Sequence, residues 1–501
     1  MTASAGGRGK AGGRGRLVAL VVLAVAIAGG GVLATVTARR PPRTTLQPAA
    51  LAAEVAPAGS ASSSWYCPGA PGPAADAGTT DLLLTNAAGR AVRVGVVVVD
   101  SLGAQRQDTL ELGPHAEASL APGQIVAGAW LAARVEVAGG AVSATELVDG
   151  RIVRTGRRGP ARSTGRTVAS CASEVSPRWY FASGSTREGS TLRVALFNPT
   201  PNLAVVDLSF VTSSGFTAPA PFQGLVVEPW TLRTLTVGAY VQNQGSIATM
   251  VTSRSGAVVA SEFQLYGPAG DAGVSLALGA PATSTRWDLP GVQDESGGAS
   301  ALVVFNPSAQ SVRVGVDVRL PSGPVAPFTQ VLGPRSVWTL PTGEELRIAP
   351  EEHYALQVRT TEPGVVIARV GSGSPRGPAP WWAQDVTVTG LETSAAHTWV
   401  VANLPVAPSP VSSAAPDARP RATSALTFQN PGRRTLRVKV VSWAGARRNV
   451  EVVEVPALEA TTVVAPSGPV FVRADGPVAV MGDASPAGMA GVVGVPAVPV
   501  R

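Results

Sequence analysis

The 501-residue sequence predicts an all-β protein that is held at a membrane by one N-terminal helix. Three observations support this fold class. A pattern of alternating apolar residues, placed around a tryptophan and an asparagine, recurs four times. The chain is rich in Gly (56) and Pro (43), which end strands and form turns. One long uncharged apolar run lies near the N-terminus, ahead of the first repeat.

The N-terminal region predicts a membrane anchor. Residues 1–16 contain basic residues and no acid, so we expect a disordered cytoplasmic basic tail. Residues 17–36 carry no charge, and at 1.5 Å per residue they span roughly the 30 Å of a hydrocarbon core as a transmembrane helix. Val36-Thr37-Ala38 has the spacing of a cleavage site, so a cleaved signal peptide is the alternative. Residues 37–64 then form a Pro/Ala/Ser linker.

Each repeat opens on a tryptophan and contains an asparagine at the end of a predicted strand. The tryptophans, about 110 residues apart, are Trp65, Trp179, Trp287 and Trp399. The asparagines are Asn86, Asn198, Asn306 and Asn430. Three of these asparagines precede proline, and Asn-Pro ends a strand because proline donates no hydrogen bond to a ladder. A proline corner also recurs ahead of a later strand, at Pro114, Pro229, Pro334 and Pro456.

The residues on both sides of each asparagine alternate between apolar and polar. In the second repeat this period of two predicts that Val194 and Leu196 are buried and that Arg193 faces water. We interpret the two strands that flank each asparagine as a hairpin with a short polar turn.

Each repeat has about 110 residues and about seven short strands, which is typical of an immunoglobulin-like or fibronectin-like β-sandwich. A propeller blade needs only about 40 to 50 residues. We therefore expect four tandem β-sandwich modules. They comprise residues 65–178, 179–286, 287–398 and 399–501.

The net charge of +7 belongs to the N-terminus. Seven of the 40 basic residues lie within the first 43 positions, where no acid occurs, so the remainder has equal numbers of basic and acidic residues. The basic balance therefore concerns membrane topology, and we expect no nucleic-acid partner.

The two cysteines, Cys67 and Cys171, fall at the two ends of the first module. We expect a disulfide between them in an oxidising compartment, which would contribute about 4 to 5 kcal/mol by restricting the unfolded chain. Two buried free thiols are the alternative.

The sequence provides little for catalysis. Its three histidines, His115, His353 and His397, fall in different repeats, and no zinc-binding or nucleophile motif is present. We therefore predict no catalytic residue, metal or cofactor. Glycoside hydrolysis needs only two carboxylates, so such an enzyme is the alternative. Glu262 stands in an apolar strand, and we interpret it as an acid on the wet face.

Two features indicate binding. One is a basic loop without acids, predicted to contact an anionic partner such as wall polymer or lipid headgroups; a solvated disordered loop is the alternative. Its arginines are Arg151, Arg154, Arg157, Arg158, Arg162 and Arg166. The other feature is the pair Trp381 and Trp382, of which at least one is expected to be exposed for carbohydrate stacking.

The chain resembles a family of actinobacterial membrane-anchored secreted proteins of unknown function. The resemblance is carried by the basic tail with residues 17–36, by Trp65–Gly69 and Ser170–Ala172, and by Trp179–Phe181. It implies a place at the membrane and a topology, and it supplies no activity or catalytic residue.

Together these features predict a non-enzymatic, single-pass cell-envelope protein. Its N-terminus would be cytoplasmic, residues 17–36 would cross the plasma membrane, and the bulk of the chain would be extracytoplasmic. It would act as a scaffold or binding module for an anionic cell-wall polymer or an envelope protein. The alternatives are a carboxylate-based carbohydrate-active enzyme and a structural stalk with no specific ligand.

Overall fold

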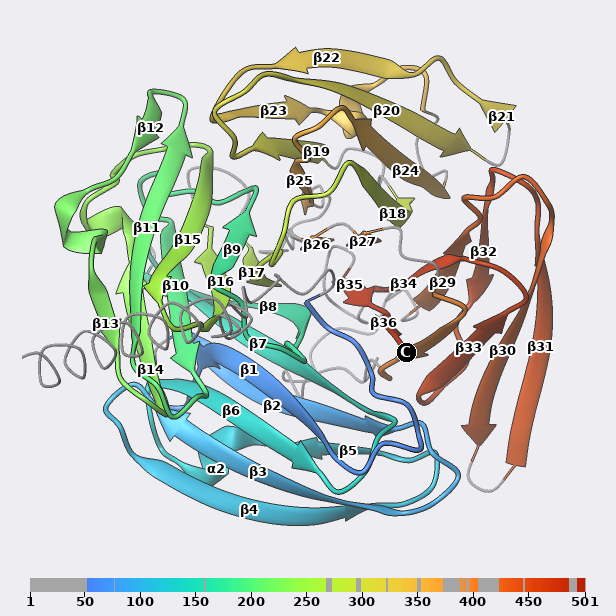
Figure 1. Ribbon diagram of the computed structural model, residues 1–501, viewed down its shortest axis with the longest axis horizontal. Helices are drawn as coiled ribbons and strands as arrows, with labels where there is room; N and C mark the ends of the chain where they lie inside the picture. The colour runs from blue at the N-terminus through green and yellow to red at the C-terminus, as the bar shows by residue number, and fades with distance from the viewer. Residues whose placement is uncertain are drawn as a thin grey trace, which may run out of the picture. The chain divides into compact units, whose positions relative to one another are not determined.

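A computed structural model gives the fold (Figure 1). It describes residues 52–500, apart from position 76 and segments 157–158, 267–272, 294–298, 321–322, 349–352, 373–387, 390, 393–395, 404–422, 445–446 and 486–492. The described part contains no helix long and apolar enough to cross a membrane, and the predicted segment 17–36 lies outside it.

The first module is built from two four-stranded antiparallel sheets. Its elements are β1 (Ser63–Pro71), β2 (Gly78–Asn86), β3 (Val92–Asp100), β4 (Gln105–Leu112), β5 (Glu117–Leu120), α2 (Pro122–Ile125), β6 (Trp130–Val137), β7 (Val142–Gly156) and β8 (Gly159–Ser170). The strand orders are β1-β6-β3-β4 and β5-β2-β7-β8. Both sheets contribute side chains to one shared core, including Trp65, Leu84 and Val94.

The other modules repeat these two strand orders, with small additions at the sheet edges. The second contains β9 (Arg178–Phe181), β10 (Thr191–Asn198), β11 (Ala204–Thr212), β12 (Gly215–Thr217), η1 (Ala220–Phe222), β13 (Leu225–Val227), β14 (Thr231–Thr236), η2 (Val237–Ala239), β15 (Ile247–Ser255), β16 (Val259–Leu265) and β17 (Val274–Leu278). The third contains β18 (Arg286–Gln293), β19 (Ala299–Asn306), β20 (Val312–Leu320), β21 (Gly323–Pro324), β22 (Phe328–Leu332), β23 (Ser336–Leu340), η3 (Thr342–Glu344), β24 (His353–Thr360), β25 (Val366–Ser372), β26 (Val388–Thr389) and β27 (Leu391–Glu392). The fourth contains β28 (Thr398–Val401), β29 (Thr423–Gln429), β30 (Leu436–Ala444), β31 (Arg447–Val455), β32 (Ala460–Val464), β33 (Val470–Ala474), β34 (Ala479–Ser485), β35 (Val493–Pro496) and β36 (Val498–Pro499).

The pairing corrects the predicted hairpins. The two strands that flank each asparagine, such as β2 and β3, lie in different sheets, so the asparagine turn crosses from one sheet to the other. The alternation of apolar and polar residues shows which residues of a strand face the core. Two strands in one sheet and two strands in facing sheets have the same alternation, so the pattern cannot tell these arrangements apart. The all-β prediction is confirmed. The strand order differs from the immunoglobulin order, which keeps the first two strands in one sheet.

Each asparagine is buried, and its side chain forms hydrogen bonds with backbone groups of the turn. The Nδ2 group of Asn198 donates to the carbonyls of Asn202 (2.7 Å) and Val227 (3.0 Å), while its Oδ1 accepts the backbone N–H of Thr200 (3.1 Å). The equivalent amides donate to the carbonyl four residues on and to a carbonyl of the proline corner in every module. The repeated asparagine therefore connects the turn to that corner.

The repeated tryptophans are also buried. In three modules the indole N–H donates a 2.8 Å hydrogen bond to a valine carbonyl, as from Trp179 to Val258. In the fourth module, Trp399 Nε1 has no hydrogen-bond partner among the described residues.

The first and second modules contact each other through Arg193, which the sequence predicts to be exposed, and through residues of neighbouring strands. Arg193 is half-buried, and its guanidinium lies 4.5 Å from the ring centroid of Trp130 in the first module. Ser261 donates to the carbonyl of Gly69 (3.1 Å), and a Cβ at Gly69 would lie only 3.0 Å from that of Ala195. The prediction that Arg193 faces water is therefore wrong, because the outer face of β10 is covered by another module. Leu196 is buried as predicted.

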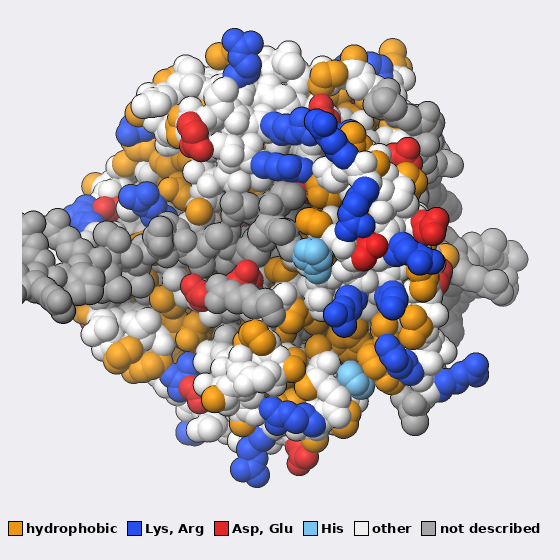
Figure 2. Space-filling model, turned by 45° about the vertical axis from the view of Figure 1, so that its right-hand side comes forward, with side chains coloured by type: hydrophobic (Ala, Val, Ile, Leu, Met, Phe, Trp, Pro, Cys, Tyr) orange, Lys and Arg blue, Asp and Glu red, His pale blue; other side chains and the backbone are white. Residues whose placement is uncertain are grey.

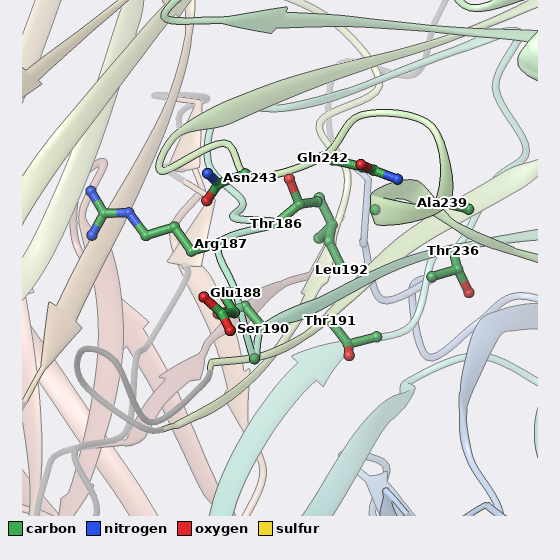
Figure 3. Close-up of a pocket in the computed structure, with 12 residues that line it drawn as sticks. Thr186, Arg187, Glu188, Ser190, Thr191, Leu192, Thr236, Ala239, Gln242 and Asn243 are labelled. Atoms are coloured by element: carbon green, nitrogen blue, oxygen red, sulfur yellow. The ribbon is translucent and has the colours of Figure 1, made fainter.

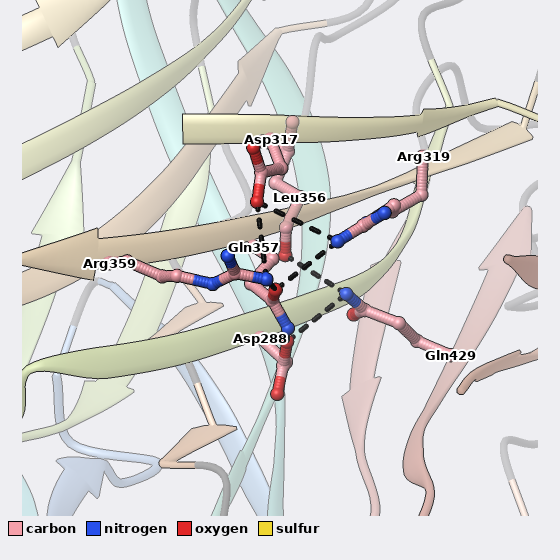
Figure 4. A network of polar contacts seen from close by, with 7 residues as sticks. All are labelled: Asp288, Asp317, Arg319, Leu356, Gln357, Arg359 and Gln429. Carbon is pink, nitrogen blue, oxygen red and sulfur yellow. Dashed lines mark hydrogen bonds and ion pairs between the residues drawn. The ribbon is translucent and has the colours of Figure 1, made fainter. Parts of the chain in front are cut away.

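A buried polar network joins the third and fourth modules (Figure 4). Asp288 on β18 accepts hydrogen bonds from Gln357 (2.7 Å) and from Gln429 of the fourth module (3.1 Å). Arg319 and Arg359 both donate to Gln357. Beside this network, the buried pair Arg369 and Asp483 crosses the same boundary at 3.6 Å.

Contacts also join the fourth module to the first. The N–H of Asn403 donates to Oε2 of Glu117 in the first module (2.9 Å), and the N–H of Val55, in the segment ahead of that module, donates to the carbonyl of Pro499 (2.8 Å). Strand β8 packs against both β17 and β35. The second and third modules contact each other through β11 with β23 and β9 with β25. Each module in the described part thus contacts the next, and the fourth contacts the first.

Candidate functional site

The predicted disulfide is present between Cys67 on β1 and Cys171, just after β8. Both residues are fully buried in the first module. The bond therefore ties the first strand of that module to its last.

The predicted basic loop is the end of the β7–β8 hairpin, whose pairing continues to Gly156 and Gly159. Arg166 is buried, and its Nε and Nη2 donate to the two carboxylate oxygens of Asp149 at 2.7 and 2.8 Å. The prediction that Arg166 contacts an anionic partner is wrong, because its guanidinium is already paired with Asp149, which lies just ahead of the segment 151–166. The side chains of Arg151, Arg154, Arg157, Arg158 and Arg162 lie outside those that the structure describes, so their role stays a prediction.

The remaining sequence candidates lie mostly outside the described residues. Trp381 and Trp382 lie outside the described residues, as does the side chain of His353. His397 is exposed. No cluster of three potential metal ligands occurs among the described residues.

Glu262 is buried, which corrects its assignment to a wet face. It lies opposite the core residue Val194 in the β10–β16 ladder, and antiparallel partners project to the same face. Glu146 occupies the equivalent place opposite Leu82 in the first module. Burial raises the pKa of each carboxyl from 4.5 to about 8. These two acids lie in the cores of different modules, so they do not form the paired carboxylates of a glycosidase.

An aromatic cluster lies where the first module meets the fourth. His115 follows Pro114 at the proline corner and adopts a positive φ of 53°. Its ring stacks on Trp443 of β30 at a centroid distance of 3.9 Å. Phe471 of β33 packs edge-on against Trp443 at 5.0 Å. We call these three residues, together with Arg448 and Arg473, the aromatic seam.

The aromatic seam borders a pocket of about 440 Å³. Its lining is apolar at Val400 and Val441 and basic at Arg448 and Arg473, and it includes no acidic residue. Partial burial, with a smaller contribution from Arg448, lowers the pKa of His115, which favours the neutral imidazole. His115 Nδ1 has no hydrogen-bond partner among the described residues. The pocket thus offers cations and a neutral imidazole beside an apolar wall.

The exposed face of the sheet that contains β30, β31 and β33 carries further basic and apolar side chains beside the pocket. Lys439 lies beside Arg473 in the β30–β33 ladder, and Val450 and Val452 on β31 are about half exposed. No ion pair in the described part involves Lys439, Arg448 or Arg473. Lys and Arg side chains gather on the right-hand side of Figure 2, with hydrophobic side chains between them. The partner strands of β30 and the contact of His115 with Trp443 arise only from the fold.

The fold and this site define a class: an all-β protein of four repeated, mutually packed modules with a basic aromatic pocket between the first and the last. The chain belongs to the family of unknown function DUF5719, whose model matches residues 155–467. No curated protein matches the chain significantly.

Solved structures give only distant similarity. The crystal structure of Thermotoga maritima 1070 is 14% identical, with 22% of this chain and 94% of that chain covered and a TM-score of 0.20. A tetra-tandem repeat from the extending region of a large adhesion protein is 14% identical, with 84% and 96% covered and a TM-score of 0.11. Streptomyces avermitilis alpha-L-rhamnosidase complexed with L-rhamnose is 11% identical, with 72% and 45% covered and a TM-score of 0.14. Similarities this low carry no functional argument.

Proposed function

We propose that this is a non-enzymatic protein of the cell envelope that binds an anionic cell-wall polymer at the aromatic seam. The observation that supports it is the combination, in one pocket, of Arg448, Arg473 and an aromatic wall with no acid among the lining residues. The basic tail and the uncharged residues 17–36 support an uncleaved anchor with the modules outside the cytoplasm. The family resemblance favours an actinobacterial source.

The chemistry of the aromatic seam fits a chain that carries phosphate or carboxylate groups. An arginine binds such groups through two parallel hydrogen bonds, and several weak contacts along a polymer add up. The exposed apolar residues beside it, Val450 and Val452, offer contact to the less polar faces of the polymer units. Arg151 and the four other arginines of the hairpin end remain a second proposed contact.

Co-sedimentation with purified cell wall tests the proposal. We expect the full-length protein in detergent to bind at 50 mM NaCl and to release at 1 M, because the Debye length falls to about 3 Å at that salt concentration. Arg448→Ser with Arg473→Ser should reduce binding at least tenfold. The matched control changes two exposed strand arginines outside the pocket, Arg93→Ser in the first module and Arg313→Ser in the third, and should bind like the wild type.

Two further arms separate the remaining parts of the proposal. A variant with Arg151, Arg154, Arg157, Arg158 and Arg162 changed to serine measures the hairpin end, and Arg166 is kept because it is buried and paired with Asp149. Equal binding by the aromatic-seam variant and its control would refute polymer binding at this pocket. For topology, protease added to spheroplasts should digest the modules, and their survival until lysis would refute the extracytoplasmic placement.

A further inference from the structure

A second hollow, of about 590 Å³, lies at one end of the second module (Figure 3). One wall is the connection from β9 to β10, with Thr186 and Arg187. The other wall is η2 with the loop that follows it, with Ala239 and Gln242. The hollow lies within one module and shares no lining residue with the aromatic-seam pocket.

Backbone hydrogen bonds hold the two walls together. The N–H of Thr186 donates to the carbonyl of Gln244 (2.9 Å), and the N–H of Asn243 donates to the carbonyl of Thr186 (3.0 Å). The N–H of Ser185 donates to Oε1 of the buried Gln264 (2.8 Å), which anchors the first wall to strand β16. The walls are therefore ordered before any ligand arrives, which lowers the entropy cost of binding.

The side chains of the hollow are mostly short and polar. Thr236 presents a hydroxyl, Gln242 and Asn243 present amides, and Arg187 and Glu188 bring one charge of each sign. Figure 3 shows Arg187 and Glu188 on one side and Gln242, Ala239 and Thr236 on the other, with Leu192 between them. No ion pair among the described residues involves Arg187 or Glu188. Hydroxyls and amides both donate and accept hydrogen bonds, so the hollow offers both kinds of partner.

This lining excludes several ligand classes. A multivalent anion would meet Glu188 as well as Arg187, and a divalent cation would find only one carboxylate. An apolar ligand would bury few apolar contacts, with Leu192 and Ala239 as the apolar lining residues. A neutral ligand with many hydroxyls satisfies both the donors and the acceptors.

We propose that this hollow is a binding site for a neutral carbohydrate. Tyr240, 58% exposed, lies in the chain between the lining residues Ala239 and Gln242 and offers a further surface beside the hollow. The site goes beyond the proposed function, because it uses a different module and a ligand without charge. The protein would then contact both a charged and an uncharged part of the envelope.

Saturation-transfer NMR on the full-length protein tests the site. The probes are maltotetraose, cellotetraose, mannotetraose and galactotetraose, and the detergent must lack a sugar headgroup. We expect transfer to at least one probe, and we expect binding to persist at 1 M NaCl because no charge is involved. Thr236→Val with Gln242→Ala should weaken binding at least tenfold. Ala239→Trp should abolish it by filling the hollow, and Ala239 is exposed, so this change leaves the core intact.

The matched control is Thr252→Val with Gln107→Ala, two exposed strand residues outside the hollow, and it should bind normally. The aromatic-seam variant Arg448→Ser with Arg473→Ser should also bind the tetrasaccharide normally, which separates the two sites. Absence of transfer to all four probes would overturn the proposal. Transfer that is unchanged by Ala239→Trp would overturn it as well.

Discussion

Asn198 shows why one buried amide recurs in every module. A turn that crosses between two sheets leaves backbone carbonyls that no ladder satisfies, and an unsatisfied buried polar group costs about 1 to 3 kcal/mol. The side chain supplies two donors and one acceptor at the required place. Aspartate would supply no donor, and serine is too short to reach both sides of the turn.

We therefore expect Asn198→Ala to lower the free energy of unfolding by about 2 to 4 kcal/mol, because two carbonyls lose their donor. Asn202→Ala, at an exposed position of the same turn, should change it by less than about 0.5 kcal/mol. Urea denaturation of the full chain measures both. Similar losses for the two variants would contradict the role given to the buried amide.

Arg193 gives a second expectation, because it packs on Trp130 and does not face water. Arg193→Ala should cost about 1 to 2 kcal/mol, from a partly desolvated cation–π contact and the lost packing of its stem. Arg233→Ala, an exposed arginine of the same module, should stay within about 0.5 kcal/mol. Chemical denaturation compares the two. Equal, small losses would mean that the first and second modules do not interlock there in solution.

The buried carboxyls predict how stability depends on pH. Between pH 4.5 and about 8 the folded protein keeps a proton on Glu262 that the unfolded chain releases. The free energy of unfolding should therefore fall as pH rises through this window, by up to about 1.4 kcal/mol per pH unit for one group. Glu262→Gln removes this titrating group and should reduce the slope between pH 5 and 8, and the share of Glu146 should remain. Urea midpoints at four pH values measure it, with exposed Glu188→Gln as control; an unchanged slope would contradict the burial.

The alternation of apolar and polar residues predicts which segments are strands and which of their residues are buried. It does not predict which strands pair with each other. The inward-facing residues of β10 and the period of about 110 residues could be predicted from the sequence, because each module places apolar residues at equivalent core positions. The partners of a strand depend on contacts that are distant in the chain, so the sequence indicates a hairpin at Asn198 where the fold has a turn between two sheets. The aromatic seam was missed for the same reason: His115 and Trp443 lie in the first and last modules. The burial of Glu262 could not be predicted either, because it follows from the position of Glu262 opposite Val194 in the ladder.

The disulfide connects β1 to the end of β8, the two termini of the first module. It closes a loop with a sequence separation of 104, so removing it should cost about 4 kcal/mol by releasing the unfolded chain. Replacing both cysteines by alanine, which the small buried site accommodates, should lower the urea midpoint accordingly. Mass spectrometry of the non-reduced protein should find the bridged peptide, and two alkylatable thiols in the native protein would contradict the bond.

Across the four modules, the apolar clusters do not respect the repeat boundaries. One cluster combines Val211 and Met250 of the second module with Phe305 of the third and Met481 of the fourth. Another joins Leu83 and Leu147 of the first module to the core of the fourth. The proline corners contribute as well, since Trp230 packs under Arg134 of the first module, much as His115 reaches the fourth. Modules that fold and unfold independently would each have an apolar core of their own, and these modules share theirs.

This sharing predicts that the modules unfold together. Phe428, fully buried in the fourth module, anchors one of the shared clusters, so Phe428→Ala should cost about 3 to 5 kcal/mol. If the interfaces couple the modules, the loss should appear as lower hydrogen-exchange protection in β10 of the second module as well as in β29. Calorimetry should show one transition at a lower temperature. Val464→Ala, at an 82% exposed position of the fourth module, should alter neither readout. Loss of protection confined to β29, with a separate early calorimetric transition, would mean that the modules are thermodynamically independent despite their contacts.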